Sequence, residues 1–206
     1  MARELTLVDA GLGNLASVER ALIQVGSATQ ITDDPDKVAT ARTVVFPGQG
    51  AFGKTTDKIV SGAMGEALRM VIQRGDPFLG ICLGMQLLFE SSEEGGGRKG
   101  LGVLGGRCRR FPNDMTAVEG EHVRKLKIPH MGWNEVQPSG EHYYFVHSYY
   151  VDAERPEDVM WTTTYGDVTF AAAVRRDNVY GCQFHPEKSQ QAGLRFLRAF
   201  LLGSRQ

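Results

Sequence analysis

Short apolar runs alternate with helical patterns through the first half of the chain. Three apolar runs, each bounded on one side by Asp or Pro, predict buried strands, and two stretches with apolar positions at helical spacing predict helices. The runs cover residues 5–8, 43–46 and 78–81, and the helical stretches cover residues 15–25 and 63–74. This alternation predicts a parallel sheet that helices cover on both faces.

The pattern changes after Glu90, where a glycine-rich, charged segment precedes aromatic and β-branched runs. We interpret the glycines at 95–100 as a flexible connection, because they lack the ending of a phosphate-binding loop. The later runs predict strands, and a final apolar periodicity predicts an amphipathic helix. The strands are expected at 143–146, 160–164, 169–174 and 179–183, and the helix contains Leu194, Leu197 and Phe200. We expect residues 1–206 to form one three-layer α/β domain with a mixed, largely parallel central sheet.

The composition is that of an ordinary globular protein. The 206 residues are 42% hydrophobic and 23% charged, with a formal net charge of −1, so nucleic-acid binding has no electrostatic support. Charged Arg3 and Glu4 precede the first apolar run, which is unlike a signal peptide, and no run approaches the roughly 20 apolar residues of a membrane helix. We therefore expect a cytoplasmic protein without membrane contacts.

The cysteines and histidines show no metal-binding pattern. Three cysteines without a Cys-x-x-Cys pair argue against a disulfide framework and against structural zinc. The histidines at 122, 130 and 142 lack metal-ligand spacing, and we interpret them as surface or loop residues. We expect neither a metal nor a cofactor, and ask which of Cys82, Cys108 and Cys182 is reactive.

The segment Gly80–Gly84 has the spacing of a nucleophile elbow, with Cys82 at its centre. A sharp strand-to-helix turn needs small residues two before and two after the nucleophile, and both are glycine here. The turn also brings the sulfur to a helix N-terminus, which favours the thiolate form of a cysteine. A buried cysteine at a glycine-punctuated strand end is the structural alternative.

Two further segments complete an acyl-transfer site. A cysteine nucleophile requires a base held by a third group, and His185 and Glu187 follow an apolar run that ends near Gln183. The glycine-flanked loop at Pro47–Gly50 follows another predicted strand. With the N–H of Leu83 it would provide two donors for a developing oxyanion. Seen alone, the His185 and Glu187 segment is more typical of a surface turn, and a plain turn is also an alternative for the loop at Pro47–Gly50.

Several motifs together resemble one family closely. They are Gly-Ile-Cys-Leu-Gly-Met-Gln at 80–86 and Gln-Phe-His-Pro-Glu at 183–187, with segments at 11–18, 129–134 and 144–149. The first two resemble class I glutamine amidotransferases, and the other three resemble the glutaminase subunits of imidazole glycerol phosphate synthase. The resemblance covers nearly the whole chain and implies a flavodoxin-like arrangement of the sheet.

The resemblance assigns roles to particular residues. Cys82 would attack the side-chain amide carbon of glutamine, and His185, oriented by Glu187, would deliver the proton that releases ammonia. Water activated by the same imidazole would then hydrolyse the thioester to glutamate. The positions that match the family's glutamine-binding residues are Gln86 and the backbone around Gly48, Gly50, Ser148 and Tyr149.

The resemblance also implies a partner. The family's subunit forms a heterodimer with an (α/β)₈-barrel cyclase, which receives the ammonia and makes imidazole glycerol phosphate and aminoimidazole carboxamide ribotide. The residues that match the region facing that partner are Trp133, Asn134, Tyr144 and His147. Two positions depart from the family: Gln49 stands where valine is usual, and Ala10 where tyrosine is common.

Three other functions fit parts of the sequence. Gly11–Ala16 matches Gly-x-Gly-x-x-Ala after a strand, with Asp33 and Asp34 downstream, which is a dinucleotide-binding pattern. That alternative leaves the Cys, His and Glu set unexplained. A subunit that acts chiefly as a regulatory or interaction module also remains open. So does the glutaminase of another amidotransferase pathway.

Overall fold

The computed structural model describes residues 3–11, 14–119 and 122–203. A seven-stranded sheet in the order β13-β14-β15-β4-β3-β1-β2 lies at its centre, parallel from β15 to β2 and antiparallel at β13 and β14. This confirms the mixed, largely parallel sheet. Its strands are β1 (Arg3–Val8), β2 (Ser27–Thr32), β3 (Val44–Gly48), β4 (Phe78–Cys82), β13 (Val159–Tyr165), β14 (Val168–Arg176) and β15 (Val179–Cys182).

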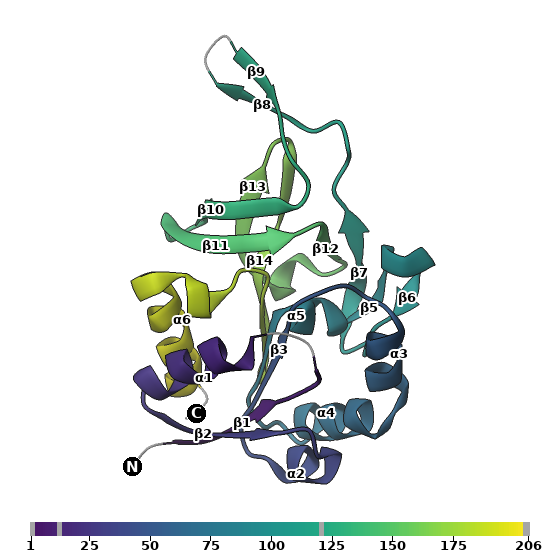
Figure 1. Cartoon of the computed structure of the whole chain (residues 1–206), viewed down its shortest axis with the longest axis vertical. Coiled ribbons are helices and arrows are strands. Elements are labelled where there is room, and N and C mark those ends of the chain that lie inside the picture. The colour runs from purple at the N-terminus through teal and green to yellow at the C-terminus, as the bar shows by residue number, and fades with distance from the viewer. Residues whose placement is uncertain (1–2, 12–13, 120–121, 204–206) are drawn as a thin grey trace.

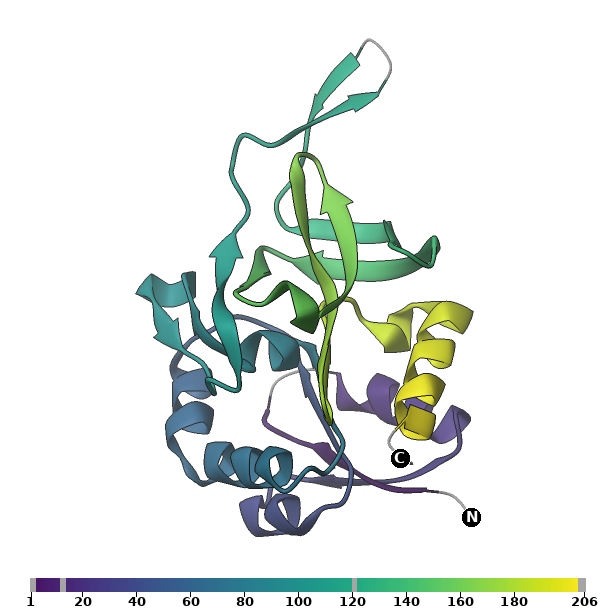
Figure 2. The same ribbon diagram turned by 180° about the vertical axis from the view of Figure 1, so that it is seen from behind.

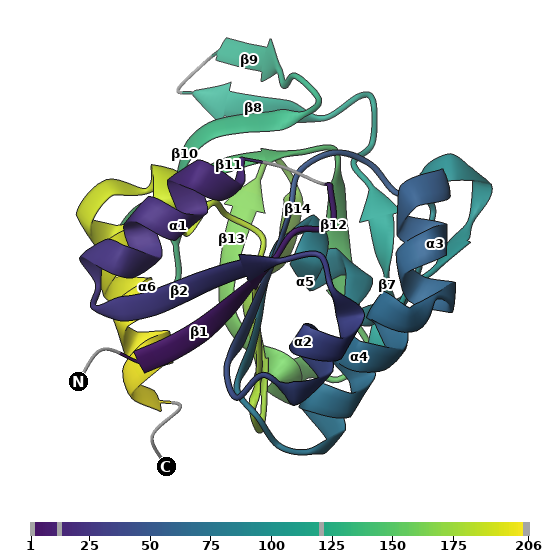
Figure 3. The same cartoon turned by 60° about the horizontal axis from the view of Figure 1, so that its bottom comes forward.

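Helices cover both faces of the sheet. One face packs against α1 and α6, and the other packs against α2 to α5 (Figure 3). Asn14 caps α1 as its sequence position indicates, because its side chain accepts a hydrogen bond from the N–H of Ser17 at 3.3 Å. The helices are α1 (Leu15–Gln24), α2 (Pro35–Thr40), α3 (Lys54–Ser61), α4 (Ala63–Gln73), α5 (Leu83–Leu87) and α6 (Gln190–Gly203), with 3-10 turns η1 (Glu94–Gly96), η2 (Pro156–Asp158) and η3 (Pro186–Lys188).

Alternate residues of the central strands enter different cores. Leu79 and Ile81 of β4 pack with α1 and α6, whereas Phe78 packs with the helices of the opposite face. In β3, Val45 faces the first core and Phe46 the second. Because successive side chains of a strand point to opposite faces, a strand that is covered twice must be apolar at every position. This explains the continuous apolar runs of the sequence.

Smaller sheets are built on the carboxyl side of the central strands. The hairpin of β8 and β9 extends away from the body of the molecule, as seen from both sides (Figures 1 and 2). The glycine-rich segment is not only a connection, because η1 and a two-residue strand form within it. The additional strands are β5 (Phe89–Ser92), β6 (Arg98–Lys99), β7 (Leu104–Arg110), β8 (Thr116–Glu119), β9 (His122–Lys125), β10 (His130–Val136), β11 (Glu141–His147) and β12 (Tyr149–Ala153).

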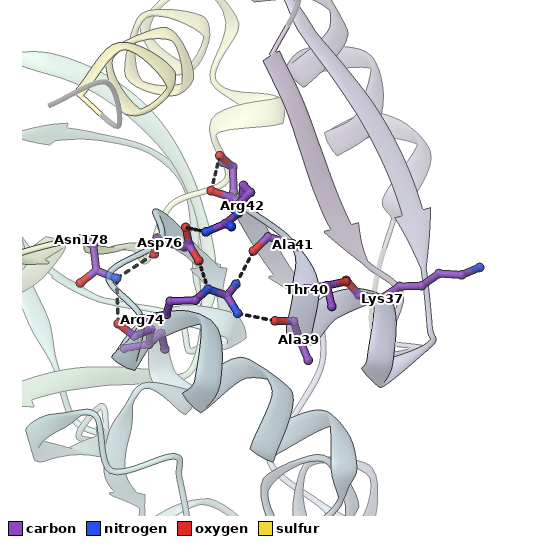
Figure 4. Close-up of polar contacts among 10 residues, drawn as sticks. Lys37, Ala39, Thr40, Ala41, Arg42, Arg74, Asp76 and Asn178 are labelled. Carbon is purple, nitrogen blue, oxygen red and sulfur yellow. Dashed lines mark hydrogen bonds and ion pairs between the residues drawn. The ribbon is translucent and has the colours of Figure 1, made fainter.

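A polar cluster ties together the loops at the amino ends of β3 and β4. Arg74, at the end of α4, donates to the carbonyl oxygens of Ala39 and Ala41, each at 2.6 Å, and pairs with Asp76 (Figure 4). Asn178 donates to the carbonyl oxygen of Asp76 at 2.7 Å. The carbonyl groups of Ala39 and Ala41 lie at the end of α2, where a helix leaves its last carbonyl groups without partners of its own. They hold the end of the sheet opposite to the elbow.

Gly193 permits the close approach of α6 to the His185–Glu187 segment. A Cβ atom at this position would lie 1.8 Å from the carbonyl oxygen of Pro186. We expect Gly193→Ala to lower the free energy of unfolding by about 1–3 kcal/mol, because the helix must move away from η3. Gly203→Ala at the end of the same helix is the control, since its Cβ would meet only the Tyr180 hydroxyl, at 3.2 Å. Equal stability of the two variants in urea would contradict this packing.

Candidate active site

Cys82 lies at a strained turn between β4 and α5. Its backbone has φ 53° and ψ −107°, in the region of positive φ that residues other than glycine rarely adopt. Leu83 begins α5 directly after it and is buried. The strand, the turn and the helix therefore form the elbow that the spacing of Gly80–Gly84 predicts.

The glycines around Cys82 are required by contacts between backbone segments. A Cβ atom on Gly80 would lie 2.5 Å from the carbonyl oxygen of Gly84, and one on Gly84 would lie 2.0 Å from that of Phe46. Gly48 is paired in register with Cys82 on the neighbouring strand β3, and its Cβ would lie 2.8 Å from that of Leu83. Glycine is therefore the residue that lets α5 begin against β3.

His185 reaches the elbow from the next strand of the sheet. It follows β15, which runs parallel to β4, and its backbone N–H donates to the carbonyl oxygen of Tyr144 at 2.9 Å. Its Nδ1 atom lies 2.8 Å from Oε1 of Glu187, and both side chains are almost completely buried. Because a carboxylate only accepts, Nδ1 carries a proton, which fixes the orientation of the imidazole.

The surroundings of His185 favour its charged form. Burial lowers the pKa of this imidazole, but hydrogen bonding and the negative charges of Cys82 and Glu187 outweigh burial and raise its pKa to about 10. Its second nitrogen, Nε2, is buried and has no partner within hydrogen-bond geometry among the described residues, although the Cys82 sulfur is close enough to act on the pKa. The ring nitrogen on the side of the Cys82 sulfur therefore still has a proton to donate.

A cavity of about 420 Å³ opens beside the sulfur, a volume typical of small-molecule sites. It brings together most of the residues that the sequence assigns to catalysis and glutamine binding. Those in its wall are Cys82, His185, Gln86, Gly50, Ser148 and Tyr149. Gly48, Leu83 and Glu187 are not in this wall. Gln49 does line the cavity, and Gly50 has φ 117°, a conformation that favours glycine.

The four residues predicted to face a partner lie on or near the hairpin of β10 and β11. Trp133 and Tyr144 are cross-strand neighbours whose rings lie 6.2 Å apart, and Trp133 is 47% exposed. Asn134 is half-buried and donates to the carbonyl oxygen of Thr164 at 2.8 Å. His147, the last residue of β11, is buried and lines the cavity that Cys82 also lines, so it does not lie on the exposed surface of the hairpin.

His130 is buried, so our interpretation of it as a surface or loop histidine is wrong. Its Nδ1 lies 3.0 Å from Nε2 of His147, and its Nε2 lies 3.3 Å from Nδ2 of Asn134. Both ring nitrogens therefore have partners, which makes burial of a polar ring tolerable. Burial lowers the pKa of His130 to about 4 and that of His147 to about 3. Of the others, His142 is exposed on β11, and the side chain of His122 lies outside the described part.

Sequence reasoning gave no role to three other side chains at this site. Gln183 is buried, and its Nε2 atom lies 3.5 Å from the Cys82 sulfur. In the sequence this residue was marked only as the first position of the Gln-Phe-His-Pro-Glu motif. Glu94 and Lys188 line the cavity. Burial raises the pKa of Glu94, partly offset by the N–H of Phe52, which donates to its carboxylate at 2.8 Å. Glu94 lies in the glycine-rich segment, where no motif marked it.

Comparison with known proteins identifies the family of the chain. The family model for glutamine amidotransferase class-I matches residues 6–203. The chain belongs to this class of glutamine amidotransferases. Within the class it groups with the proteins called imidazole glycerol phosphate synthase subunit HisH. It is 48% identical to that of Syntrophotalea carbinolica over 95% of this chain and 98% of the relative, and 46% identical to that of Salinibacter ruber over 95% and 92%.

Solved structures share the fold at low sequence identity. A crystal structure described as a glutamine amidotransferase has a TM-score of 0.70 at 18% identity, covering 96% of this chain and 98% of the other. The structure of PurLQS from Thermotoga maritima has a TM-score of 0.73 at 16% identity and full coverage of both chains. These comparisons confirm the class I amidotransferase fold. The dinucleotide-binding prediction depends partly on residues 12 and 13, which lie outside the described residues.

The part of the chain that the structure describes contains no helix with the length and apolar content needed to cross a membrane.

The buried histidine pair predicts a loss of stability in mild acid. The unfolded chain binds protons at the ordinary histidine pKa of 6.5, whereas His130 and His147 take them up in the folded state only near pH 4 and 3. The unfolded state therefore binds more protons between these limits, and the free energy of unfolding falls as the pH falls from 6.5 to about 4.

We expect His130→Gln to make this decline shallower by on the order of 1–3 kcal/mol, because one buried titrating group is removed. Urea unfolding at several pH values measures it. His142→Gln, on the exposed side of the neighbouring strand, is the control. Parallel stability curves for the wild type and the His130 variant would contradict the assignment.

Proposed function

We propose that this chain is a glutaminase, formed as one domain over residues 1–206, that hydrolyses L-glutamine to glutamate and ammonia. The observation that carries the proposal is a cysteine at a positive-φ elbow, beside a charged imidazole bound to a buried carboxylate, at the wall of one cavity. Nucleophile, acid–base group and orienting group are the parts that covalent acyl transfer requires.

In the first half of the reaction, the thiolate of Cys82 attacks the side-chain carbonyl carbon of glutamine. The carbonyl oxygen becomes an oxyanion, which the N–H of Leu83 and an N–H of the loop at Gly48–Gly50 would stabilise. His185 donates its Nε2 proton to the amide nitrogen, the C–N bond breaks, and ammonia leaves. A γ-glutamyl thioester on Cys82 remains, and the imidazole is neutral.

In the second half, water replaces ammonia. His185 takes a proton from water, which attacks the thioester, and the C–S bond then breaks. The products are glutamate and the thiolate–imidazolium pair with which the cycle began. Glu187 keeps Nδ1 protonated in both halves, so that Nε2 is the atom that exchanges the proton.

The amino-acid end of glutamine would lie against the polar part of the cavity wall. Glu94 has a carboxylate whose pKa burial raises, so an ammonium group beside it would stabilise its charged form. Gln86, Ser148 and Tyr149 add polar groups to the same wall. We therefore assign the α-amino group of the substrate to Glu94.

We propose further that the ammonia passes to a cyclase of the (α/β)₈-barrel type in a heterodimer. That cyclase would make imidazole glycerol phosphate and aminoimidazole carboxamide ribotide in histidine biosynthesis, in the cytoplasm. The support is the 46–48% identity to proteins named as a subunit of that synthase. The exposed Trp133 on the hairpin beside the cavity is a suitable anchor for a partner. The other solved amidotransferase structures are only 16% and 19% identical to this chain, so they give no support to a different pathway.

A glutamine-analogue electrophile tests the nucleophile. We expect 6-diazo-5-oxonorleucine to label Cys82 and to leave the other two thiols unlabelled. Burial raises the pKa of Cys108 and Cys182 well above the ordinary value, which keeps both in the unreactive thiol form. Mass mapping of the adduct is the measurement.

Two variants accompany the labelling. Cys82→Ala should take up no label and lose activity, and Glu187→Gln should be labelled at the same sulfur with a smaller loss of activity, because only the orientation of the base is impaired. An adduct on Cys108 or Cys182, with Cys82 unmodified, would remove the proposed mechanism.

The partner proposal predicts a change in rate. We expect glutamine hydrolysis by the isolated chain to be slow and to rise by about tenfold or more when the cyclase and its nucleotide are added, which corresponds to about 1.4 kcal/mol of added transition-state stabilisation. Trp133→Ala should weaken association about 30-fold or more, and Met70→Ala, an exposed residue on α4, should not. Equal rates with and without the partner would exclude the coupling, and unchanged binding of the Trp133 variant would exclude the interface.

A further inference from the structure

Gln183 connects the nucleophile to the wall of the cavity. Its side chain is completely buried, and its backbone N–H is held by the carbonyl oxygen of Ala172 at 2.8 Å. One end of its amide lies 3.5 Å from the Cys82 sulfur, and the other lies 3.0 Å from the amide nitrogen of Gln86. Neither the acid–base pair nor the oxyanion loop uses this side chain.

The carbonyl group of Tyr149 determines how the side-chain amides of Gln86 and Gln183 are oriented. The amide nitrogen of Gln86 lies 2.9 Å from the carbonyl oxygen of Tyr149, which can only accept. Gln86 therefore presents its two N–H bonds, one to Tyr149 and one to Gln183. Gln183 must accept this bond with its amide oxygen, so its own NH₂ group points at the sulfur. A reversed amide would place two donors against each other.

A fixed donor changes the behaviour of the sulfur. Hydrogen bonds to a charged acceptor are stronger than those to a neutral one, so an N–H aimed at sulfur favours the thiolate over the thiol. Cys108 differs from Cys82 in this respect, because its sulfur itself donates to the carbonyl oxygen of Gln86 at 3.7 Å, and burial raises its pKa.

We propose that Gln183 is a positioning residue for the hydrolysis. By donating from Nε2 it holds the Cys82 sulfur toward the cavity as a thiolate, and so leaves Nε2 of His185 free to serve the leaving nitrogen. This inference rests on the proposed glutaminase function. It adds a second stabilising group for the nucleophile, linked through Gln86 to the glutamine-binding wall.

Alkylation of Cys82 with iodoacetamide as a function of pH tests the inference without requiring glutamine turnover. Gln183→Met keeps an unbranched side chain of similar length but removes the donor. We expect its alkylation at neutral pH to be about tenfold slower, with a rate profile displaced to higher pH, as loss of one hydrogen bond to a charged group implies. The kcat for glutamine should fall while KM changes little.

Gln183→Glu provides the second measurement, because it conserves volume but places an acceptor near the sulfur. We expect it to slow alkylation more than Gln183→Met does. Gln73→Met, at an exposed position of α4, is the matched control. Thermal melting shows whether each Gln183 variant folds. If one of them does not, the alkylation rate of the other variant tests the proposal.

Wild-type alkylation profiles in the folded Gln183 variants would overturn the proposal, as would a slow Gln183→Met beside a normal Gln183→Glu, which would indicate volume rather than donation. Either result leaves the glutaminase proposal intact, because that depends on which cysteine the glutamine analogue labels.

Discussion

The contact between the β4–α5 turn and strand β3 is the constraint on which the site depends. The carbonyl oxygen of Phe46 occupies the space that a side chain on Gly84 would fill. The carbonyl oxygen of Gly84 occupies the corresponding space at Gly80. This close contact restricts the backbone conformation of the turn, in which Cys82 has a positive φ. The reactive group is thus held by backbone packing in the middle of the sheet, where a protein is most rigid.

Buried imidazoles near this turn have opposite charge preferences, and their partners explain the difference. His185 lies between a sulfur and a carboxylate, so its pKa rises despite burial. His130 and His147 have no carboxylate among their hydrogen-bond partners in the described residues, so burial dominates and their pKa values fall, that of His147 further because of the charge of His185. The neutral pair serves as a hydrogen-bonded link. His147 and Gln86 both bond to the carbonyl oxygen of Tyr149, which joins the β10–β11 hairpin to the amides that reach Cys82.

Local patterns predicted the elements that carry the chemistry. The apolar runs at β3 and β4 were recognisable because strands covered on both faces have no polar positions, and Asn14 was recognisable as a cap. The elbow was predictable because its glycines are required within a few residues of Cys82. His185 and Glu187 were predictable because their hydrogen bond spans two positions in one segment. Each of these signals lies within a few neighbouring residues, so a single sequence is enough to reveal it.

The remaining features depend on contacts between distant segments. Gln183 and Cys82 are 101 positions apart, and nothing local indicates that an amide points at the sulfur. His130 had no metal-ligand spacing, and only the pairing of β10 with β11 brings His147 opposite it and buries both. The sequence by itself therefore determined the proposed nucleophile, its proposed base and the sheet that carries them. Tertiary structure alone decided which polar side chains support them, because burial and hydrogen-bond direction arise only when the strands are assembled.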